Sequence, residues 1–268
     1  MQGDLDKLKG SSSVFLTIHD VGTSYESWVK FTQHEDMKEV KDRSLFLHLS
    51  LPGQKLNDED LAEEFVFPDM HSLGMSLVTV LDQLRINRVI VLGSGAGANI
   101  GCRFAMNHPT RVHGVVLMNC NPEKGDSSIL DKLKGRKASR DEDSKQNVRN
   151  VAKFEESYKK RDEITSLLAT KLKAETLLMV GAKNKNVKGS EEIHKQVKAG
   201  ICSIIKIEDV DNVLEEAEEK AADAIILFCQ GVCLLPTVQR KISRQMSNNL
   251  EKLSEDGDES STKLNMTR

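Results

Sequence analysis

The sequence lacks any apolar run long enough to cross a membrane. Its longest apolar stretch, Ala224 to Leu235, is interrupted by Gln230 and Gly231, whereas a membrane-spanning helix needs about 20 consecutive apolar residues. The opening MQGDLDKLKGSSS also has none of the apolar character of a secretory signal. These two absences predict a cytoplasmic protein without a transmembrane segment.

The sequence is also poor in net charge and in organised cysteine. Its formal net charge of −3 is too small to create the field that nucleic-acid binding requires, so we expect no nucleic-acid partner. The cysteines are odd in number and scattered, and no histidine accompanies the pair that stands one helical turn apart. We therefore expect reduced thiols, no metal and no cofactor. The cysteines are Cys102, Cys120, Cys202, Cys229 and Cys233.

What the sequence does contain is a series of short apolar runs that alternate with helical patterns. The runs are rich in β-branched residues and end near glycine, proline or asparagine, as buried strands do. Such alternation predicts a parallel sheet covered by helices on both faces, an α/β fold. The expected strands are Val14 to Ile18, Ser44 to Leu49, Arg88 to Leu92, Val112 to Met118, Thr176 to Val180 and Ser203 to Ile207.

Segments outside this rhythm divide the chain. Residues 1–13 form an N-terminal tail, 14–235 one α/β domain, and 236–268 a C-terminal tail too poor in apolar residues to fold, so we expect it to be disordered. Within the domain, 121–173 is a charged cap insertion, and Val148 to Leu172 favours helices. Elsewhere apolar residues recur at intervals of three and four, as in helices packed on a core. These helices are expected at Trp28 to Val40, Asp69 to Leu84, after Gly97 to about Asn107, and Val213 to Cys229.

The turn after the third strand carries the strongest motif, GSGAGANIG. Gly93, Gly95 and Ala98 match the dinucleotide fingerprint G-x-G-x-x-A, in which a pyrophosphate approaches the start of a helix. No Asp or Glu follows the next strand to bind a ribose, which disfavours this interpretation. Gly93 and Gly97 also match G-x-Nu-x-G, the tight turn that displays the nucleophile of an α/β-hydrolase. We therefore expect an α/β-hydrolase-like fold.

The three positions that carry hydrolase chemistry hold residues unable to perform it. The nucleophile slot is Gly95, which has no side chain. The chain order in this fold is nucleophile, acid, histidine, which puts the acid slot at Asn184 and the histidine slot at Asp211. No histidine follows His194, so we expect no general base after the acid slot and no enzyme activity.

A displaced hydrolase site is an enzymatic alternative. It would use Ser94, one residue before the empty slot, with His19 or His194 as the base. His19 and Asp20 are also candidates for a ligand-binding loop, although they fit better as residues that hold the turn through backbone hydrogen bonds. Cys120, in an apolar setting without a base, fits better as a structural thiol than as a nucleophile.

Seven blocks of the sequence resemble the N-myc downstream-regulated (NDR) family. They are HDVG at His19 to Gly22, FTQHEDMKEV at Phe31 to Val40, LPGQ at Leu51 to Gln54, FVFPDM at Phe65 to Met70, GSGAGANI at Gly93 to Ile100, HGVVLMNCNP at His113 to Pro122 and ILFCQG at Ile226 to Gly231. The resemblance implies an α/β-hydrolase fold without hydrolase activity. It also implies roles in signalling, stress response, growth or differentiation, exerted through protein partners or a small ligand.

Two features depart from the family pattern. Members of the family begin with a β-hairpin before HDVG, where this sequence has only a short segment. Their cap is also longer than the insertion at 121–173. The sequence therefore resembles a divergent or N-terminally shortened member of the family.

Two serines follow paired basic residues. Ser139 stands after Arg136 and Lys137, and Ser243 after Arg240 and Lys241, in two segments that are rich in charge. These serines are candidate targets of basophilic kinases, whose added phosphate charge would alter docking to a partner.

Overall fold

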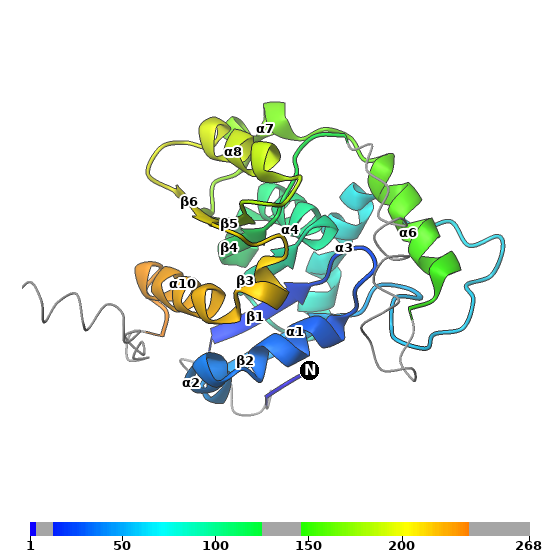
Figure 1. Ribbon diagram of the computed structural model, residues 1–268, viewed down its shortest axis with the longest axis horizontal. Coiled ribbons are helices and arrows are strands. Elements are labelled where there is room, and N and C mark those ends of the chain that lie inside the picture. The colour runs from blue at the N-terminus through cyan, green and yellow to red at the C-terminus, as the bar shows by residue number, and fades with distance from the viewer. Residues whose placement is uncertain (4–12, 125–145, 236–268) are drawn as a thin grey trace, which may run out of the picture. The chain divides into compact units, whose positions relative to one another are not determined.

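A six-stranded, all-parallel sheet forms the centre of the molecule (Figure 1). The computed structural model describes residues 1–3, 13–124 and 146–235. The strand order is β2-β1-β3-β4-β5-β6, and the six expected strands are present with ends that shift by no more than two residues. The strands are β1 (Ser13–Ile18), β2 (Ser44–Leu49), β3 (Val89–Ser94), β4 (Val112–Met118), β5 (Glu175–Gly181) and β6 (Cys202–Ile207).

Helices cover both faces of this sheet. They are α1 (Tyr25–Thr32), α2 (Lys38–Asp42), α3 (Met70–Gln83), α4 (Ala96–Asn107), α6 (Val148–Lys159), α7 (Thr165–Lys171), α8 (Val187–Gln196), α9 (Val213–Glu216) and α10 (Glu218–Gly231). Figure 1 shows α1 and α10 on one side of the sheet and α4 and α8 on the other. Leu16 of β1 packs in one apolar cluster with residues of α3 and α4, whereas its neighbour Phe15 stacks on Phe46 of β2, with ring centroids 4.7 Å apart. The α/β fold class is thereby confirmed.

Helix α3 forms where its apolar spacing predicts it. Asp69 precedes the helix, and its side chain accepts a hydrogen bond from the backbone N–H of Ser72 at 2.7 Å, which satisfies one of the free donors of the first turn. Leu73, Leu77 and Leu81 recur every four residues and are buried. This face packs against α4, and so α3 supports the helix that follows the glycine-rich turn.

The expected helix from Trp28 to Val40 is broken into α1, a 3₁₀ turn (Glu35–Met37) and α2. At the break, the His34 side chain accepts a hydrogen bond from the backbone N–H of Asp36 at 3.4 Å and caps a new turn. The apolar spacing continues across this break because both parts cover the same face of the sheet, so the spacing alone does not locate it.

The expected last helix, Val213 to Cys229, is broken as well. Ala217 has a non-helical backbone, φ −142° and ψ 43°, between α9 and α10. Glu216 accepts hydrogen bonds from the backbone N–H groups of Asp211 and Asn212 at 3.2 and 3.0 Å. These contacts stabilise α9 as a separate turn beside the carboxyl end of β5.

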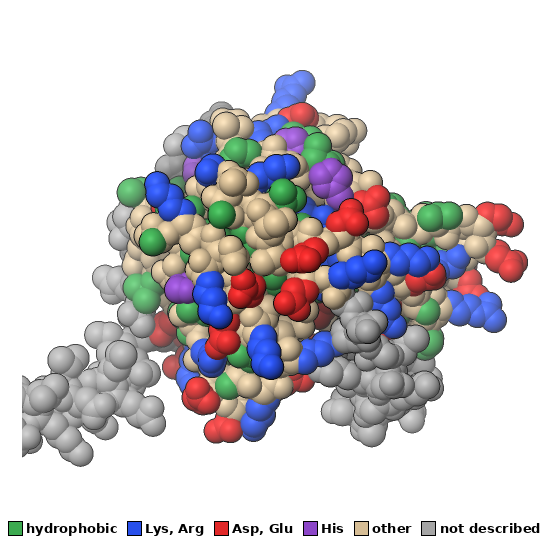
Figure 2. Space-filling view, turned by 90° about the horizontal axis from the view of Figure 1, so that it is seen from above, with side chains coloured by type: hydrophobic (Ala, Val, Ile, Leu, Met, Phe, Trp, Pro, Cys, Tyr) green, Lys and Arg blue, Asp and Glu red, His purple; other side chains and the backbone are tan. Residues whose placement is uncertain are grey.

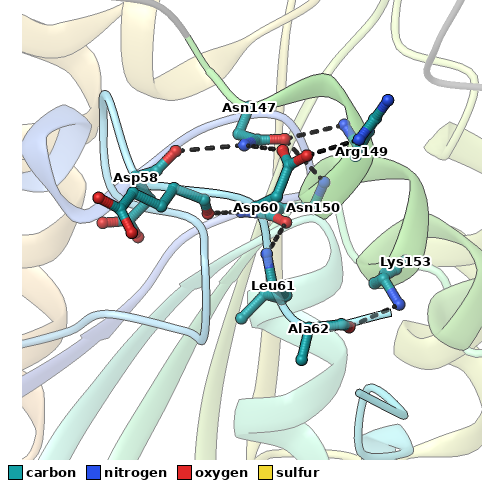
Figure 3. A network of polar contacts seen from close by, with 9 residues as sticks. Asp58, Asp60, Leu61, Ala62, Asn147, Arg149, Asn150 and Lys153 are labelled. Carbon is teal, nitrogen blue, oxygen red and sulfur yellow. Dashed lines mark hydrogen bonds and ion pairs between the residues drawn. The ribbon is translucent and has the colours of Figure 1, made fainter. Parts of the chain in front are cut away.

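Helix α6 holds the long loop that joins β2 to α3 (Figure 3). Asn150 of α6 is fully buried. Its amide nitrogen donates to the carbonyl oxygens of Gly53 and Glu59 at 3.1 and 2.8 Å, and its carboxamide oxygen accepts from the N–H of Leu61 at 2.9 Å. One side chain thus pairs with three backbone groups of a loop that has no regular secondary structure to pair them.

A lysine one turn further along α6 fastens the end of this loop. Lys153 Nζ donates to the carbonyl oxygens of Ala62, Glu63 and Phe65 at 3.3, 3.0 and 3.1 Å.

The described part of the cap insertion contains α6 and α7, as its pattern predicts. Residues 4–12, 125–145 and 236–268 lie outside the described residues, and with them both candidate phosphorylation sites, Ser139 and Ser243.

The surface carries charges of both signs. On the face shown in Figure 2, Asp and Glu side chains are interspersed with Lys and Arg rather than gathered by sign. None of the helices in the described ranges is long and apolar enough to traverse a bilayer.

Of the five cysteines, Cys102, Cys120 and Cys229 are buried, but Cys202 is only half-buried and Cys233 is exposed. Cys202 is less buried than Cys102 and Cys120 because it lies on β6, an edge strand of the sheet.

Candidate functional site

A small pocket lies at the carboxyl ends of the central strands. It has a volume of about 70 Å³. The sheet is built outward in both directions from β1, so the neighbours β1 and β3 form the switch point where open α/β sheets bind their ligands. The pocket is lined by Asp20, Val21, Thr23, Ser27, Ser94, Gly95, Asn119, Tyr158, Arg161, Asn184, Lys185, Asn186, Asp211, Asn212, Leu214 and Glu215.

The turn between β3 and α4 has the tight strand-to-helix geometry that its motif predicts. Gly95 is the single residue between the strand and the helix, with φ +53° and ψ −113°, a conformation that strains residues with a side chain. At Gly97 a Cβ would lie 2.2 Å from the carbonyl oxygen of Ile18, so the helix begins pressed against β1. The residue at the apex of the turn has no side chain.

Asp20, in the turn after β1, fills the space above Gly95. A Cβ built on Gly95 would lie 2.1 Å from Asp20 Cγ and 2.2 Å from each carboxylate oxygen. Asp20 Oδ1 accepts hydrogen bonds from the backbone N–H groups of Val21 at 2.7 Å and Ala96 at 2.8 Å. In α/β-hydrolases the amide after the nucleophile and an amide from a strand-to-helix loop together bind the oxyanion. Here the protein's own carboxylate occupies the corresponding pair.

The histidines considered as bases do not face the pocket. The ring of His19 is buried, and its Nδ1 donates to the carbonyl oxygen of Asp20 at 2.9 Å, while its Nε2 accepts from the N–H of Leu51 at 3.4 Å. Burial lowers the pKa of His19 to about 4, which keeps the ring neutral and both nitrogens engaged. His194 is exposed on α8. Ser94 lines the pocket, but no histidine is among the residues that line it.

Asn184 and Asp211, the expected acid and histidine slots, lie together in the lining of the pocket. Asn184 Nδ2 donates to the Asp211 carboxylate at 2.7 Å and to its carbonyl oxygen at 2.9 Å. Asn119, at the end of β4, donates to the same carbonyl at 3.2 Å and accepts from the N–H of Gly181 at 3.2 Å. The tertiary structure thus brings Gly95, Asn184 and Asp211 into the lining of one pocket, although they are far apart in the sequence.

Two residues of the pocket, Tyr158 and Arg161, were missed by sequence reasoning. They stand at and just after the end of α6, in the run YKKR, which resembles an ordinary charged helix end. The only sequence signal was the position of this segment in a cap insertion, a place from which caps contribute residues to the pocket below.

The fold agrees with comparisons to known proteins. The family model of the Ndr family matches residues 1–141 and 136–236. The chain belongs to the Ndr family. Among curated relatives of this Ndr-family chain, an uncharacterized protein of Caenorhabditis elegans is 31% identical and covers 94% of this chain and 87% of its own length. Protein NDRG3 of Xenopus tropicalis is 27% identical, and the match covers 86% of this chain and 70% of the relative's own length.

Solved structures establish the α/β-hydrolase fold of this Ndr-family chain. A hydrolase from Pseudomonas aeruginosa superposes with a TM-score of 0.66 at 16% identity, covering 81% of this chain and 89% of its own. A structure from work on the carboxylesterases of Nitrososphaera gargenis superposes with a TM-score of 0.69 at 16% identity. The match covers 86% of this chain and 93% of that chain. At this level of identity the likeness concerns the fold alone.

The structure disfavours the dinucleotide interpretation of Gly93, Gly95 and Ala98. In that interpretation the amides at the start of α4 bind a pyrophosphate. The N–H of Ala96 instead donates to Asp20. A pyrophosphate there would meet the carboxylate of Asp20, and two like charges in one site repel each other.

Proposed function

We propose that this Ndr-family protein is a non-catalytic α/β-hydrolase-fold protein of the cytoplasm. It acts by binding protein partners or a small ligand, in signalling, stress response or growth and differentiation. The degenerate positions Gly95, Asn184 and Asp211 replace the nucleophile, acid and histidine of an active hydrolase.

The observation that carries this proposal is the position of the Asp20 carboxylate. A serine at an active elbow projects into the space that Asp20 holds here. The tetrahedral intermediate of acyl transfer also needs two free amides, and removal of even one such donor costs about 10² to 10³ in rate. Both corresponding amides are bonded to Asp20 Oδ1. The nucleophile's space and the oxyanion's binding site are therefore filled by the same group.

The rival function, hydrolysis by Ser94 with His19 or His194, lacks a base in reach. A base must hydrogen-bond the hydroxyl that it deprotonates. Both nitrogens of His19 are engaged by backbone groups of Asp20 and Leu51, and His194 projects from the exposed side of α8.

A serine-directed fluorophosphonate probe tests the proposal. We expect the full-length chain to show no labelling above that of Ser94→Ala, which removes the hydroxyl in the pocket. A folded, active esterase treated in parallel shows that the probe is reactive. Labelling of the wild-type chain that disappears in Ser94→Ala would establish the displaced hydrolase and refute the proposal.

The binding role and its regulation have their own test. An affinity pull-down with the intact chain and with residues 236–268 removed should recover different sets of partners if the C-terminal segment docks them. Mass spectrometry of protein from its native cells should find phosphate on Ser139 or Ser243. Identical partners for both chains, with both serines always unmodified, would exclude the regulatory part.

A further inference from the structure

We propose that the edge strand β6 pairs with β6 of a second copy of this chain. The two strands run antiparallel across a two-fold axis and join two sheets into one, and main-chain hydrogen bonds supply most of the affinity. The inference goes beyond the proposed function and does not rest on it, because no residue of β6 lines the pocket.

The first support is an open row of backbone groups along β6. Among the described strands, β6 pairs only with β5, at one edge of the sheet (Figure 1). The carbonyl oxygens of Ile201 and Ile207 accept hydrogen bonds from the β5 side of the sheet, at 2.8 Å each. Because strand residues alternate in direction, the N–H and C=O groups of Cys202, Ile204 and Lys206 point away from β5.

The opposite edge of the sheet, at β2, is covered by the start of the chain. The N–H of Gln2 donates to the carbonyl oxygen of Phe46 at 2.9 Å, and the N–H of Phe46 donates back to Gln2 at 2.8 Å. The side chain of Gln2 also accepts a hydrogen bond from Thr32 Oγ1 at 2.7 Å. An edge strand is a template for another strand unless it is covered or interrupted. Within the described residues, β2 is covered in this way and β6 is not.

Strand β6 also has few of the features by which edge strands resist pairing. Such features are proline, a bulge, or a charge that projects along the edge. The six residues of β6, CSIIKI, include no proline, and their register with β5 is uninterrupted. Lys206 carries the only charge of the strand, and its Nζ lies 2.5 Å from Glu191 Oε1 of α8. Ile205 is 37% exposed, so the strand offers apolar surface as well as backbone groups.

The charges that flank β6 favour a second copy as the occupant. Lys198 precedes the strand, Glu208 follows it, and both residues are exposed. Antiparallel pairing places the beginning of each strand beside the end of the other, which brings the Lys198 of each copy toward the Glu208 of the other. The two-fold axis forms this favourable contact twice, whereas parallel pairing of two copies would bring like charges together.

The alternation of residues along β6 restricts the register of the two copies. The outward-facing residues must pair with one another, so one strand can shift against the other only in steps of two residues. When Ile204 lies opposite Lys206 of the other copy, the axis passes Ile205, and the two Ile205 side chains meet on one face of the joined sheet. Each isoleucine then covers apolar surface that the single chain exposes.

The length of β6 sets the expected strength of the contact. Its six residues span about 20 Å, and an interface of this length belongs to the weak, reversible class that buries less than about 1,200 Å². We therefore expect a monomer–dimer equilibrium at micromolar concentrations rather than a permanent dimer.

Sedimentation velocity of the full-length chain, from about 5 to 500 µM, tests the inference. We expect the average mass to rise from that of one chain toward that of two. Ile204→Pro removes an outward-facing N–H that the pairing with β5 does not use, which an edge strand tolerates, and it should keep the chain monomeric. Ile204→Ala loses similar apolar packing but keeps the N–H, so it should still dimerise.

Substitutions at the axis test the antiparallel geometry and remain informative if Ile204→Pro fails to fold. Ile205→Lys and Ile205→Glu each place like charges across the axis and should weaken the dimer by about tenfold or more. An equimolar mixture of the two variants should restore it, because opposite charges then meet. The same changes at Leu167 of α7, which is also 37% exposed, should have no effect.

Three results would overturn the inference. The first is a chain that stays monomeric at every concentration. The second is a dimer that Ile204→Pro and both Ile205 variants leave unchanged, which would place the contact elsewhere. The third is a mixture of the Ile205 variants that stays as weakly associated as either variant alone.

Discussion

At the scale of single residues, Gly95 and Asp20 form a coupled pair. Gly95 has the positive φ of the elbow, and the carboxylate of Asp20 occupies the space that any side chain at position 95 would need. The two positions therefore constrain each other: the glycine admits the carboxylate, and the carboxylate excludes a nucleophile.

This coupling predicts how Gly95→Ser behaves. We expect it to lower the free energy of unfolding by about 2–4 kcal/mol, through backbone strain and overlap with Asp20. In an Asp20→Gly background the cost should shrink, because the overlap is gone, and a double-mutant cycle by urea unfolding measures the difference.

Gly200 offers a matched control for backbone strain. It also has a positive φ, +92°, but a Cβ there meets nothing within 4 Å. Gly200→Ser should therefore show the cost of the backbone alone. Strictly additive costs for Gly95→Ser and Asp20→Gly would contradict the account of the pair.

Two histidines, one buried and one half-buried, predict a dependence of stability on pH. Burial lowers the pKa of His19, and chiefly burial that of His48, from 6.5 to about 4 in the folded chain. The unfolded chain therefore binds protons more readily between these values. The contribution is fully present above pH 6.5 and is lost as the pH falls toward 4, by up to about 3 kcal/mol for His19.

Urea unfolding at pH 7 and pH 5 checks this expectation. His19→Gln should flatten the pH dependence, because glutamine cannot take up a proton on unfolding. His194→Gln, which changes an exposed histidine, should leave it unchanged. An equal pH dependence in wild type and His19→Gln would mean that other groups are responsible.

At the scale of secondary-structure elements, α6 is hydrogen-bonded to the loop between β2 and α3 and holds that loop in place. Asn150 and Lys153 together bind five backbone carbonyls and one backbone N–H of the loop between β2 and α3 (Figure 3). Because α6 ends at the pocket, this loop indirectly positions Tyr158 and Arg161.

Asn150→Ala should loosen the loop selectively. It removes three hydrogen bonds to partly buried backbone groups, so we expect a loss of about 2–4 kcal/mol in stability and faster amide hydrogen exchange at residues 53–65 than in β3. Arg149→Ala is the control, because its ion pair with Asp60 is exposed and contributes little. Uniform acceleration across the sheet would show that Asn150 supports the whole fold instead.

At the scale of the whole molecule, the pocket is the product of convergence. Parallel strands direct their carboxyl ends to one edge of the sheet, so turns that are separated by more than a hundred residues meet there. The chain retains the α/β-hydrolase architecture, and in our proposal the groups that perform hydrolysis are replaced at Gly95, Asn184 and Asp211.

A reconstruction tests whether Asp20 is the decisive obstacle. We expect the variant Gly95→Ser, Asn184→Asp, Asp211→His to remain unlabelled by a fluorophosphonate, because Asp20 still fills the elbow. Addition of Asp20→Gly should produce labelling of the new serine, since both oxyanion amides are then free. Labelling of the triple variant before Asp20 is removed would show that the carboxylate yields its place readily.

The sequence by itself determined the six strands, α3, α4 and the glycine-rich turn. These depend on local apolar spacing, on β-branched runs and on glycine, which act over a few residues. It also predicted that Gly95, Asn184 and Asp211 belong to one site, because each follows or precedes a recognisable strand or helix in a fixed order, and the structure places all three in the lining of one pocket. The sequence did not predict the helix breaks at His34 and Ala217, because the apolar spacing continues across both of them.

Only the tertiary structure decided what fills the site. No local sequence pattern predicts that the Asp20 carboxylate accepts a hydrogen bond from the N–H of Ala96, because the pairing of β1 with β3 brings the two residues together. The same holds for Tyr158 and Arg161, whose burial in the lining of the pocket depends on how the cap packs over the strand ends. Contacts of this kind arise from long-range packing, which composition and periodicity do not encode.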